Sequence, residues 1–198
     1  HGEPMPITDL EVGPDGNVYL TTGGAAGQGG LYKVSWTGAR PQQPDMTGVL
    51  AIVRQPQPIS SWGWAAIARL KTSMGASFAT ELEKLARTAT ADSGDRARAV
   101  LEMQRHGAAP SPQLLTALAR DRDAGVRAAA VYVAGVQTSA GAKAVAAAAL
   151  KDASPMVRRR AAEAIVRQGL TPGQPSFAPV GDIYALLKDA DRFVRYAG

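Results

Sequence analysis

The sequence is poor in the residues on which most catalytic and metal centres depend. It has no cysteine and only two histidines, His1 and His106. The absence of cysteine excludes disulfides, thiol nucleophiles, cysteine-ligated zinc, iron–sulfur clusters and c-type haem attachment. Two histidines leave almost no supply for a histidine-ligated metal or a Ser-His-Asp triad. We therefore expect no catalytic residue, no cofactor-binding residue and no metal ligand in this chain.

Long apolar runs are missing as well. No stretch approaches the roughly 18 consecutive apolar residues that a membrane-spanning helix needs, so no transmembrane segment is expected. The opening residues, His1-Gly2-Glu3-Pro4, contain neither the basic stretch nor the apolar run of a signal peptide, and they lack a Met. We expect the chain to start after processing or to be an internal piece of a longer protein.

The composition that remains suits a folded chain with unevenly distributed charge. Hydrophobic residues make up 45% of the chain and charged residues 20%, which favours a packed core over disorder. Residues 1–58 hold three basic and five acidic residues, a net charge of −2, whereas residues 59–198 hold nineteen and twelve, a net charge of +7. The second part can attract an anionic partner, but its charges are mixed in sign.

Residues 1–36 are predicted to be β-structure. Ile7–Val12 and Asn17–Thr21 alternate apolar and polar side chains around the turn Gly13-Pro14-Asp15-Gly16, which predicts a hairpin. Leu31–Trp36 supplies a third strand, after a glycine-rich segment, Gly23–Gly30, that is expected to be a flexible loop. Three strands leave one apolar face and an edge uncovered, so either the helical part or the rest of a larger β-domain is expected to cover them.

Residues 37–59 form a proline-rich connector, and residues 60–198 are predicted to be helical repeats. Within the connector, Val49–Val53 is either one more strand or a segment that packs across the junction. In the helical part, the pattern of Asp, four residues, a small apolar residue and Arg recurs at intervals of 29, 31 and 37 residues. Its copies are Asp92 with Arg98, Asp121 with Arg127, Asp152 with Arg158, and Asp189 with Arg195. A period of this length is typical of an α-solenoid.

Capping signals agree with that period. Ser111-Pro112 and Ser154-Pro155 each combine an N-cap residue with proline at the first helical position. The other predicted N-caps are Ser61, Ser77, Ser93, Asp123 and Asp191. Each repeat is therefore expected to be a pair of antiparallel helices whose alanine-rich faces permit close packing. The fold class that follows is mostly α, with a small antiparallel β segment at the N-terminus.

These repeats resemble HEAT repeats, including the short variety of the phycobilin lyases. The resemblance rests on Leu118-Ala119-Arg120-Asp121, Leu150-Lys151-Asp152 and Leu187-Lys188-Asp189, each followed by its Val-Arg pair. In that family the Asp and Arg form a ladder between neighbouring turns, and the concave face, lined by the second helices, binds proteins or sometimes nucleic acid. The wider last interval contains Thr171–Pro175, which looks like an insertion.

The first region resembles the closing blade of a six-bladed propeller of the soluble sugar dehydrogenase or NHL kind. The residues that carry this resemblance are Ile7–Leu10, Gly13–Leu20 and Gly30–Val34. A blade, a proline-rich connector and HEAT repeats in this order resemble large extracytoplasmic bacterial proteins described as membrane-bound dehydrogenases. That resemblance implies a periplasmic or otherwise extracytoplasmic location, and pyrroloquinoline quinone with calcium as cofactors of the parent protein, none of them bound by this chain.

A few residues have both a functional and a plain structural interpretation. Arg159 and Arg160 are candidates for contact with phosphates or an acidic partner, although they are more simply solvated and cannot share one helix face with Arg158. Trp62 and Trp64 either mark a binding patch or seal the junction between the sheet and the helices. Other residues with two interpretations are Asp9 and Asp15, as calcium ligands or as strand-end and turn residues, and His106, as a functional group or as a cation at a helix end.

These observations favour a scaffold that binds a protein partner and is itself no enzyme. The first alternative is the support region of a quinoprotein sugar dehydrogenase, whose parent would carry the activity. The second alternative is a basic HEAT-like nucleic-acid binder, which is disfavoured because acidic residues interrupt the turns of the repeats.

Overall fold

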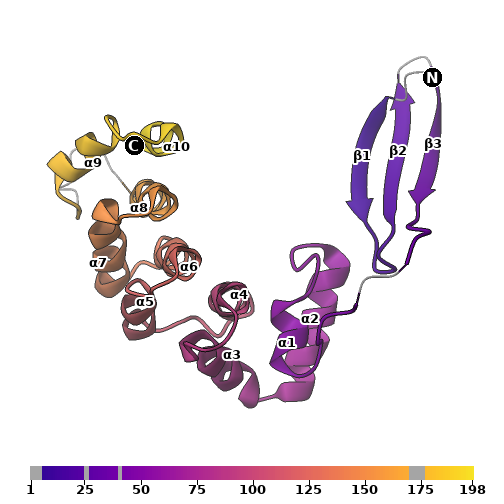
Figure 1. Ribbon diagram of the computed structural model, residues 1–198, viewed down its shortest axis with the longest axis horizontal. Helices are drawn as coiled ribbons and strands as arrows, with labels where there is room; N and C mark the ends of the chain where they lie inside the picture. The colour runs from indigo at the N-terminus through magenta and orange to yellow at the C-terminus, as the bar shows by residue number, and fades with distance from the viewer. Residues whose placement is uncertain (1–5, 25–26, 40–41, 170–176) are drawn as a thin grey trace.

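The chain forms a three-stranded sheet followed by an arc of helices (Figure 1). The computed structural model describes residues 6–24, 27–39, 42–169 and 177–198. The strands are β1 (Ile7–Val12), β2 (Val18–Gly24) and β3 (Gly27–Val34). The first helices are α1 (Val49–Val53), α2 (Ser61–Met74), α3 (Ser77–Arg87), α4 (Ser93–Arg105) and α5 (Pro112–Leu118). The remaining ones are α6 (Ala124–Ala134), α7 (Ala140–Ala148), the 3₁₀ turn η1 (Ala149–Lys151), α8 (Pro155–Arg167), α9 (Val180–Leu186) and α10 (Arg192–Ala197). The predicted class, mostly α with a small N-terminal antiparallel sheet, is confirmed.

The sheet is an antiparallel meander in the order β1-β2-β3. The predicted hairpin turn is present: Gly16 has a φ of 77°, and the Asp15 carboxylate accepts a hydrogen bond from the Asn17 amide. The expectation of a flexible loop over Gly23–Gly30 is wrong for its described residues. Gly23 and Gly24 belong to β2, and Gly27–Gly30 belong to β3, because their backbones pair across the two strands.

The apolar stretch of the connector is a short helix. The sequence leaves open whether it forms a strand or a segment that packs across the junction. Val49–Val53 forms α1, and Ala51, Ile52 and Val53 are buried among the helices. Helical packing therefore begins before residue 60. Burial of one side of a single helical turn explains the apolar run, which by its composition alone also suits a strand.

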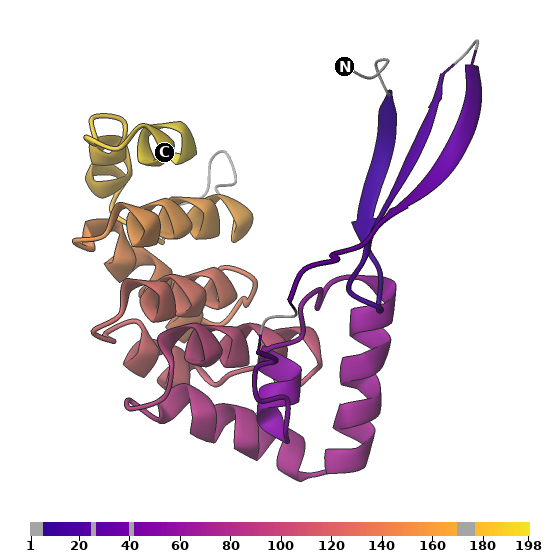
Figure 2. The same cartoon turned by 45° about the vertical axis from the view of Figure 1, so that its right-hand side comes forward.

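From α3 onward the helices form two layers (Figures 1 and 2). We call α4, α6, α8 and α10 the inner helices, because they line the concave side of the arc, and α3, α5, α7 and α9 the outer helices. Leu114, Leu115 and Leu118 of α5 and Val126, Ala130, Val133 and Ala134 of α6 are buried between the layers, as predicted. Small residues bring the inner helices close together: a Cβ on Gly135 would lie 2.6 Å from the Ala164 Cβ of α8.

Several helix starts differ from the sequence prediction by one residue or in the group that caps them. Ser111, Asp123 and Asp191 accept backbone N–H bonds as expected. The cap of α2 is Ser60 and not Ser61, and the cap of α4 is Asp92 and not Ser93. Ser77 and Ser154 make no side-chain cap bond. The Ser154 amide nevertheless donates to the Asp152 carboxylate, as the Asp123 and Asp191 amides donate to Asp121 and Asp189 in the equivalent turns.

Two further observations complete the fold. The insertion predicted at Thr171–Pro175 lies outside the described residues. Among the helices of the described ranges, none is both long and apolar enough to cross a membrane.

Candidate functional site

Arginine–aspartate pairs join neighbouring helix pairs along the arc. Arg127 donates through Nε and Nη2 to the two carboxylate oxygens of Asp152, both at 2.8 Å. Arg158 makes the same two-bond contact with Asp189, at 2.7 and 2.8 Å. In both cases Nη1 also donates to the carbonyl oxygen six residues earlier, on Asp121 and Asp152 respectively. Each of these arginines therefore ties its own turn to the next helix pair.

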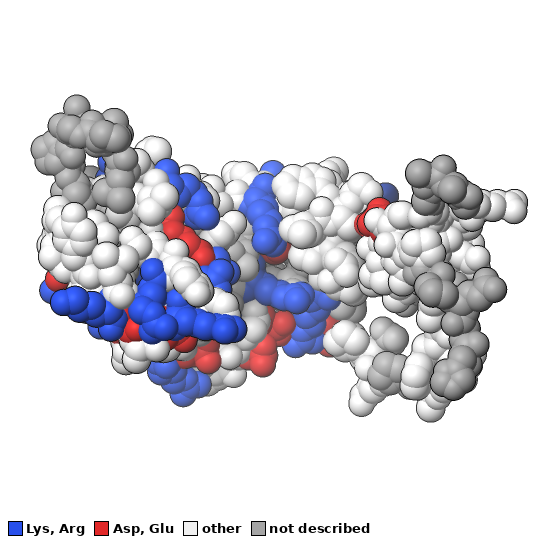
Figure 3. Space-filling view, turned by 90° about the horizontal axis from the view of Figure 1, so that it is seen from above, with Lys and Arg blue, Asp and Glu red and all other residues white. Residues whose placement is uncertain are grey.

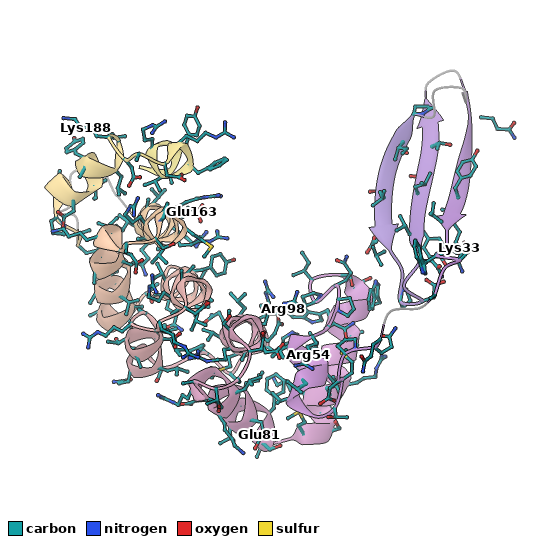
Figure 4. The ribbon with its side chains drawn as sticks, in the orientation of Figure 1. Lys33, Arg54, Glu81, Arg98, Glu163 and Lys188 are labelled. Atoms are coloured by element: carbon teal, nitrogen blue, oxygen red, sulfur yellow. The ribbon has the colours of Figure 1, made fainter. Side chains whose placement is uncertain are left out.

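The first copy of the pattern does not form the predicted pair. Arg96, and not Arg98, binds the Asp121 carboxylate, and Asp95 is bound by Arg54 of the connector. Arg98 donates to the Val53 and Gln55 carbonyl oxygens behind α1. Figure 4 places Arg54 and Arg98 between α1 and α4. Arg96 lies four residues after the α4 cap Asp92, as Arg127 and Arg158 lie four residues after Asp123 and Ser154, so the position relative to the helix start determines which arginine reaches the next turn. Arg98 is two residues further on, about 200° around the helix, and faces the other way.

The ends of the pattern have separate roles. Asp92 caps α4 by accepting from the Asp95 amide. Arg195 donates through Nη1 to the Asp189 and Ala190 carbonyl oxygens, as Arg127 and Arg158 do in their own turns. Within the described part of the chain no carboxylate pairs with Arg195. We call the four pairs Arg54–Asp95, Arg96–Asp121, Arg127–Asp152 and Arg158–Asp189 the ladder.

Three ladder carboxylates, those of Asp121, Asp152 and Asp189, have pKa values below the usual one and are held in the charged form. Burial raises the pKa of Asp121, but the Arg96 guanidinium and the Asp123 amide outweigh it and leave the pKa below its usual value. The pKa of Asp152 is lowered by the same balance with Arg127. The hydrogen bonds from Arg158 lower the pKa of Asp189 to about 2. Groups held so firmly in one state are structural and are poor proton donors or acceptors near neutral pH.

The inner helices carry a groove made of three adjoining hollows. The first lies between α2 and α4, the second crosses α4, α6 and α8, and the third lies between α8 and α10. Arg105 lines both the first and the second hollow, and Met156 lines both the second and the third. The second hollow is lined by Ala97, Leu101, Arg105, Gly125, Ala128, Ala129, Tyr132, Met156 and Arg160. Figure 3 looks into the arc from above and shows basic side chains, interspersed with acidic ones, gathered over the helical part. We call these three neighbouring hollows together the inner groove.

Guanidinium groups in the inner groove, and those of Arg167 and Arg192 beside it, rest on aromatic rings. Arg160 and Arg167 lie 5.3 and 5.2 Å from the centroid of the Tyr132 ring. Arg159 and Arg192 lie 5.8 and 4.6 Å from the centroid of the Phe193 ring. Cations at these distances are attracted to the ring faces, which restricts the motion of the side chains.

The two candidate arginines of α8 are joined by one acid. Glu163 accepts from Arg159 at 2.8 Å and from Arg160 at 2.7 Å, and Figure 4 places it on the inner side of α8. Arg159 and Arg160 therefore both reach Glu163 on one side of α8, while Arg158 belongs to the ladder. This agrees with the expectation that Arg158 does not share one helix face with Arg159 and Arg160.

The two tryptophans have different roles. Trp62 donates through its indole N–H to the Val12 carbonyl oxygen at 3.1 Å and so links the sheet to α2. Trp64 instead stacks on His106 of the helical part, with the ring centroids 4.3 Å apart, and lines the first hollow. The junction prediction therefore describes Trp62, and Trp64 belongs to the inner groove.

His106 does not act as a cation at a helix end. Its ring is buried, and its Nε2 lies 3.4 Å from the Glu102 carboxylate. Burial, followed by the charges of Lys71 and Arg105, lowers the pKa of His106. The α4 terminus is instead served by Lys71, which donates to the His106 carbonyl oxygen. Burial also raises the pKa of Glu102, although Arg105 opposes the shift.

The aspartates of the sheet have the plain structural role. Asp15 accepts from the Lys33 ammonium and the Tyr19 hydroxyl, both at 2.8 Å, besides holding its turn. Asp9 accepts from the amide of Leu10. The described residues contain no group of three or more His, Asp or Glu side chains arranged to hold a metal ion. They therefore offer no fit for calcium, and we assign no quinone chemistry to them.

Sequence reasoning missed most of the inner groove. Arg105, Tyr132, Arg167, Arg192 and Phe193 carry no repeat motif. One signal was present within α8, where Met156, Arg160, Glu163 and Arg167 recur at intervals of four, three and four residues and so share one helix face. The other members come together only through packing.

Comparison with known proteins returns no match: no protein-family model, no curated protein and no solved structure is similar to this chain at the threshold applied. The HEAT and propeller resemblances accordingly stay predictions.

Proposed function

We propose that this chain is a non-catalytic scaffold of the HEAT-repeat kind that binds a protein partner in its inner groove. The observation that carries the proposal is the row of three neighbouring hollows from α2 to α10, in which Arg105 and Met156 each line two. A surface that spans five helices suits a macromolecular partner better than a small ligand.

The residue types in the groove support this function. Arginine, tyrosine, tryptophan and methionine are enriched in protein interfaces, and Arg160, Tyr132, Trp64 and Met156 are among the groove residues. The ladder fixes the spacing of the helix pairs before a partner arrives. A preformed surface loses less conformational entropy on binding, which favours affinity.

Site-specific photo-crosslinking tests the proposal. A benzoylphenylalanine at position 97 lies in the inner groove, and one at position 144 lies in the hollow between the outer helices α5 and α7. In an extract of the source cells, we expect one reproducible protein adduct from position 97 and none from position 144. Equal labelling from both positions, or no adduct from position 97, would refute the proposal.

A second candidate function, the support region of a quinoprotein sugar dehydrogenase, is favoured by one observation on the sheet. Leu10, Tyr32 and Val34 are 57, 46 and 54% exposed, which suits a sheet that further β-structure covers. The parent would then be extracytoplasmic and would use quinone and calcium held elsewhere. Sugar-dependent dye reduction by the parent protein, with this chain alone inactive, is the expected result; a parent inactive with added quinone and calcium argues against it.

A further inference from the structure

We propose that the partner presents an acidic segment that also carries apolar side chains, and that this segment lies in extended form across α4, α6 and α8. The inference rests on the proposed function and specifies the chemistry of the partner. In this arrangement carboxylates of the segment pair with Arg105, Arg160 and Arg167, and its apolar side chains contact Leu101 and Met156.

The charge of the groove points to an anion. Arg105 and Arg160 each have one carboxylate neighbour, and that of Arg105, Glu102, is buried with 1% of its side chain exposed. Arg167 is exposed and rests on the Tyr132 ring, and within the described residues no carboxylate pairs with it. Cations gathered in a hollow with low-dielectric walls raise the local concentration of anionic groups.

The floor of the groove points to apolar side chains between the anionic ones. Ala97, Leu101, Ala128 and Ala129 line it without any charge, and the Met156 side chain is half exposed beside them. Methionine adapts its shape to a partner because three of its bonds rotate freely. A segment with carboxylates alone would leave this floor in contact with water.

The Tyr132 and Phe193 rings favour a peptide over nucleic acid as the segment bound in the groove. Single-stranded nucleic acid is held by bases that stack on open aromatic faces. Here guanidinium groups already lie over the Tyr132 and Phe193 rings.

The spacing of the helices sets the length of the segment. Packed helices lie about 8–10 Å apart, and a chain extended as polyproline II advances about 3.1 Å per residue with three residues per turn, so about one turn of three residues passes each inner helix and every third side chain faces the groove. About nine residues cross α4, α6 and α8. An apolar side chain at every third position, with acids between, matches this spacing.

Fluorescence anisotropy with synthetic probes tests the proposal on the whole chain. The probe is a labelled ten-residue peptide with Leu or Phe at every third position and Glu or Asp elsewhere. Its comparison probes are the same peptide with Ala at every third position, the same peptide with Lys for each acid, and a ten-nucleotide single-stranded DNA. We expect the acidic–apolar peptide to bind at least ~10-fold more tightly than each of the others, a ratio that corresponds to ~1.4 kcal/mol. The Ala peptide lacks the apolar contacts, the Lys peptide carries the wrong charge, and the DNA finds the aromatic rings already covered by guanidinium groups.

Charge reversal identifies the site. We expect Arg167→Glu to weaken binding by ~10-fold or more, because a like charge replaces an opposite one in the groove. Arg120→Glu makes the same change of net charge in the outer hollow between α5 and α7, and we expect it to change binding by less than ~2-fold. Neither arginine belongs to the ladder, so circular dichroism should show both variants folded.

Three results would overturn the inference: no binding of the acidic–apolar peptide, equal effects of the two charge reversals, or tighter binding of the DNA. The crosslinking experiment separates this failure from failure of the proposed function. An adduct from position 97 in a system where the peptide does not bind keeps the groove as a protein-binding surface and removes only the acidic class of partner.

Discussion

Replacing Arg127 by Met is the sharpest test of how the helix pairs are held together. The substitution keeps a long, flexible side chain but removes both bonds to Asp152 and those to the Asp121 and Arg122 carbonyl oxygens. It leaves the Asp152 carboxylate in a nearly buried position without its cation. The matched control is Arg87→Met, which removes the exposed pair of Arg87 with Glu83 within α3.

The magnitudes follow from exposure. The Arg127 and Asp152 side chains are 16 and 13% exposed, whereas those of Arg87 and Glu83 are 48 and 42% exposed. Breaking a buried pair costs about 3–5 kcal/mol, so a nearly buried, two-bond pair should cost about 2–4 kcal/mol. An exposed pair four residues apart on a helix contributes only about 0.3–0.5 kcal/mol.

Urea unfolding followed by circular dichroism measures the difference. With a slope of about 2 kcal/mol per molar urea, we expect the midpoint to fall by about 1–2 M for Arg127→Met and by less than about 0.3 M for Arg87→Met. A double-mutant cycle with Asp152→Asn isolates the pair itself. Equal midpoints for the two variants would show that the ladder is no more than a set of surface ion pairs.

Three further outcomes are expected. Gly135→Ala should lower the free energy of unfolding by about 1–3 kcal/mol, because its Cβ would overlap α8. Gly181→Ala, in open space on α9, should raise that free energy by up to about 1 kcal/mol. Thermal unfolding compares the two variants, and a Gly135→Ala variant as stable as the parent would contradict the close packing. The folded pKa values of Asp121 and Asp152 lie below their usual 3.8, so the stability that these carboxylates add is full above pH 3.8 and is lost as the pH falls further. Acid titration followed by circular dichroism should show this loss. In Arg127→Met the loss of stability on acidification should be smaller. Arg98→Met should remove the hydrogen bonds to the Val53 and Gln55 carbonyl oxygens and so speed hydrogen exchange of the backbone amides around α1. Unchanged exchange rates would show that these hydrogen bonds are dispensable.

The sequence predicted the parts of this molecule that local chemistry determines. The hairpin turn at Asp15 and the caps at Ser111, Asp123 and Asp191 depend on residues close in sequence, and the structure has all of them. Arg127 also lies opposite Asp152, because the pattern recurs on turns of the same geometry.

Features that depend on packing between distant segments could not be predicted in the same way. Arg54 of the connector binds Asp95, and Arg98 binds carbonyl oxygens next to α1, a single helical turn whose apolar run also suits a strand. The inner groove joins Arg105 of α4 to Arg160 of α8, and only the curvature of the arc brings them to one hollow. Burial of His106 beneath Trp64 likewise depends on the contact between α2 and α4.

Three neighbouring pairs of the ladder differ in the length of chain that they enclose. Arg96–Asp121 and Arg127–Asp152 span 25 residues, whereas Arg158–Asp189 spans 31 and keeps two bonds of 2.7 and 2.8 Å. Six additional residues therefore leave this ladder contact intact. The number of residues between the two partners of a ladder pair can therefore vary. Foreign peptides inserted between α8 and α9 should be displayed without changing the curvature of the remaining helices.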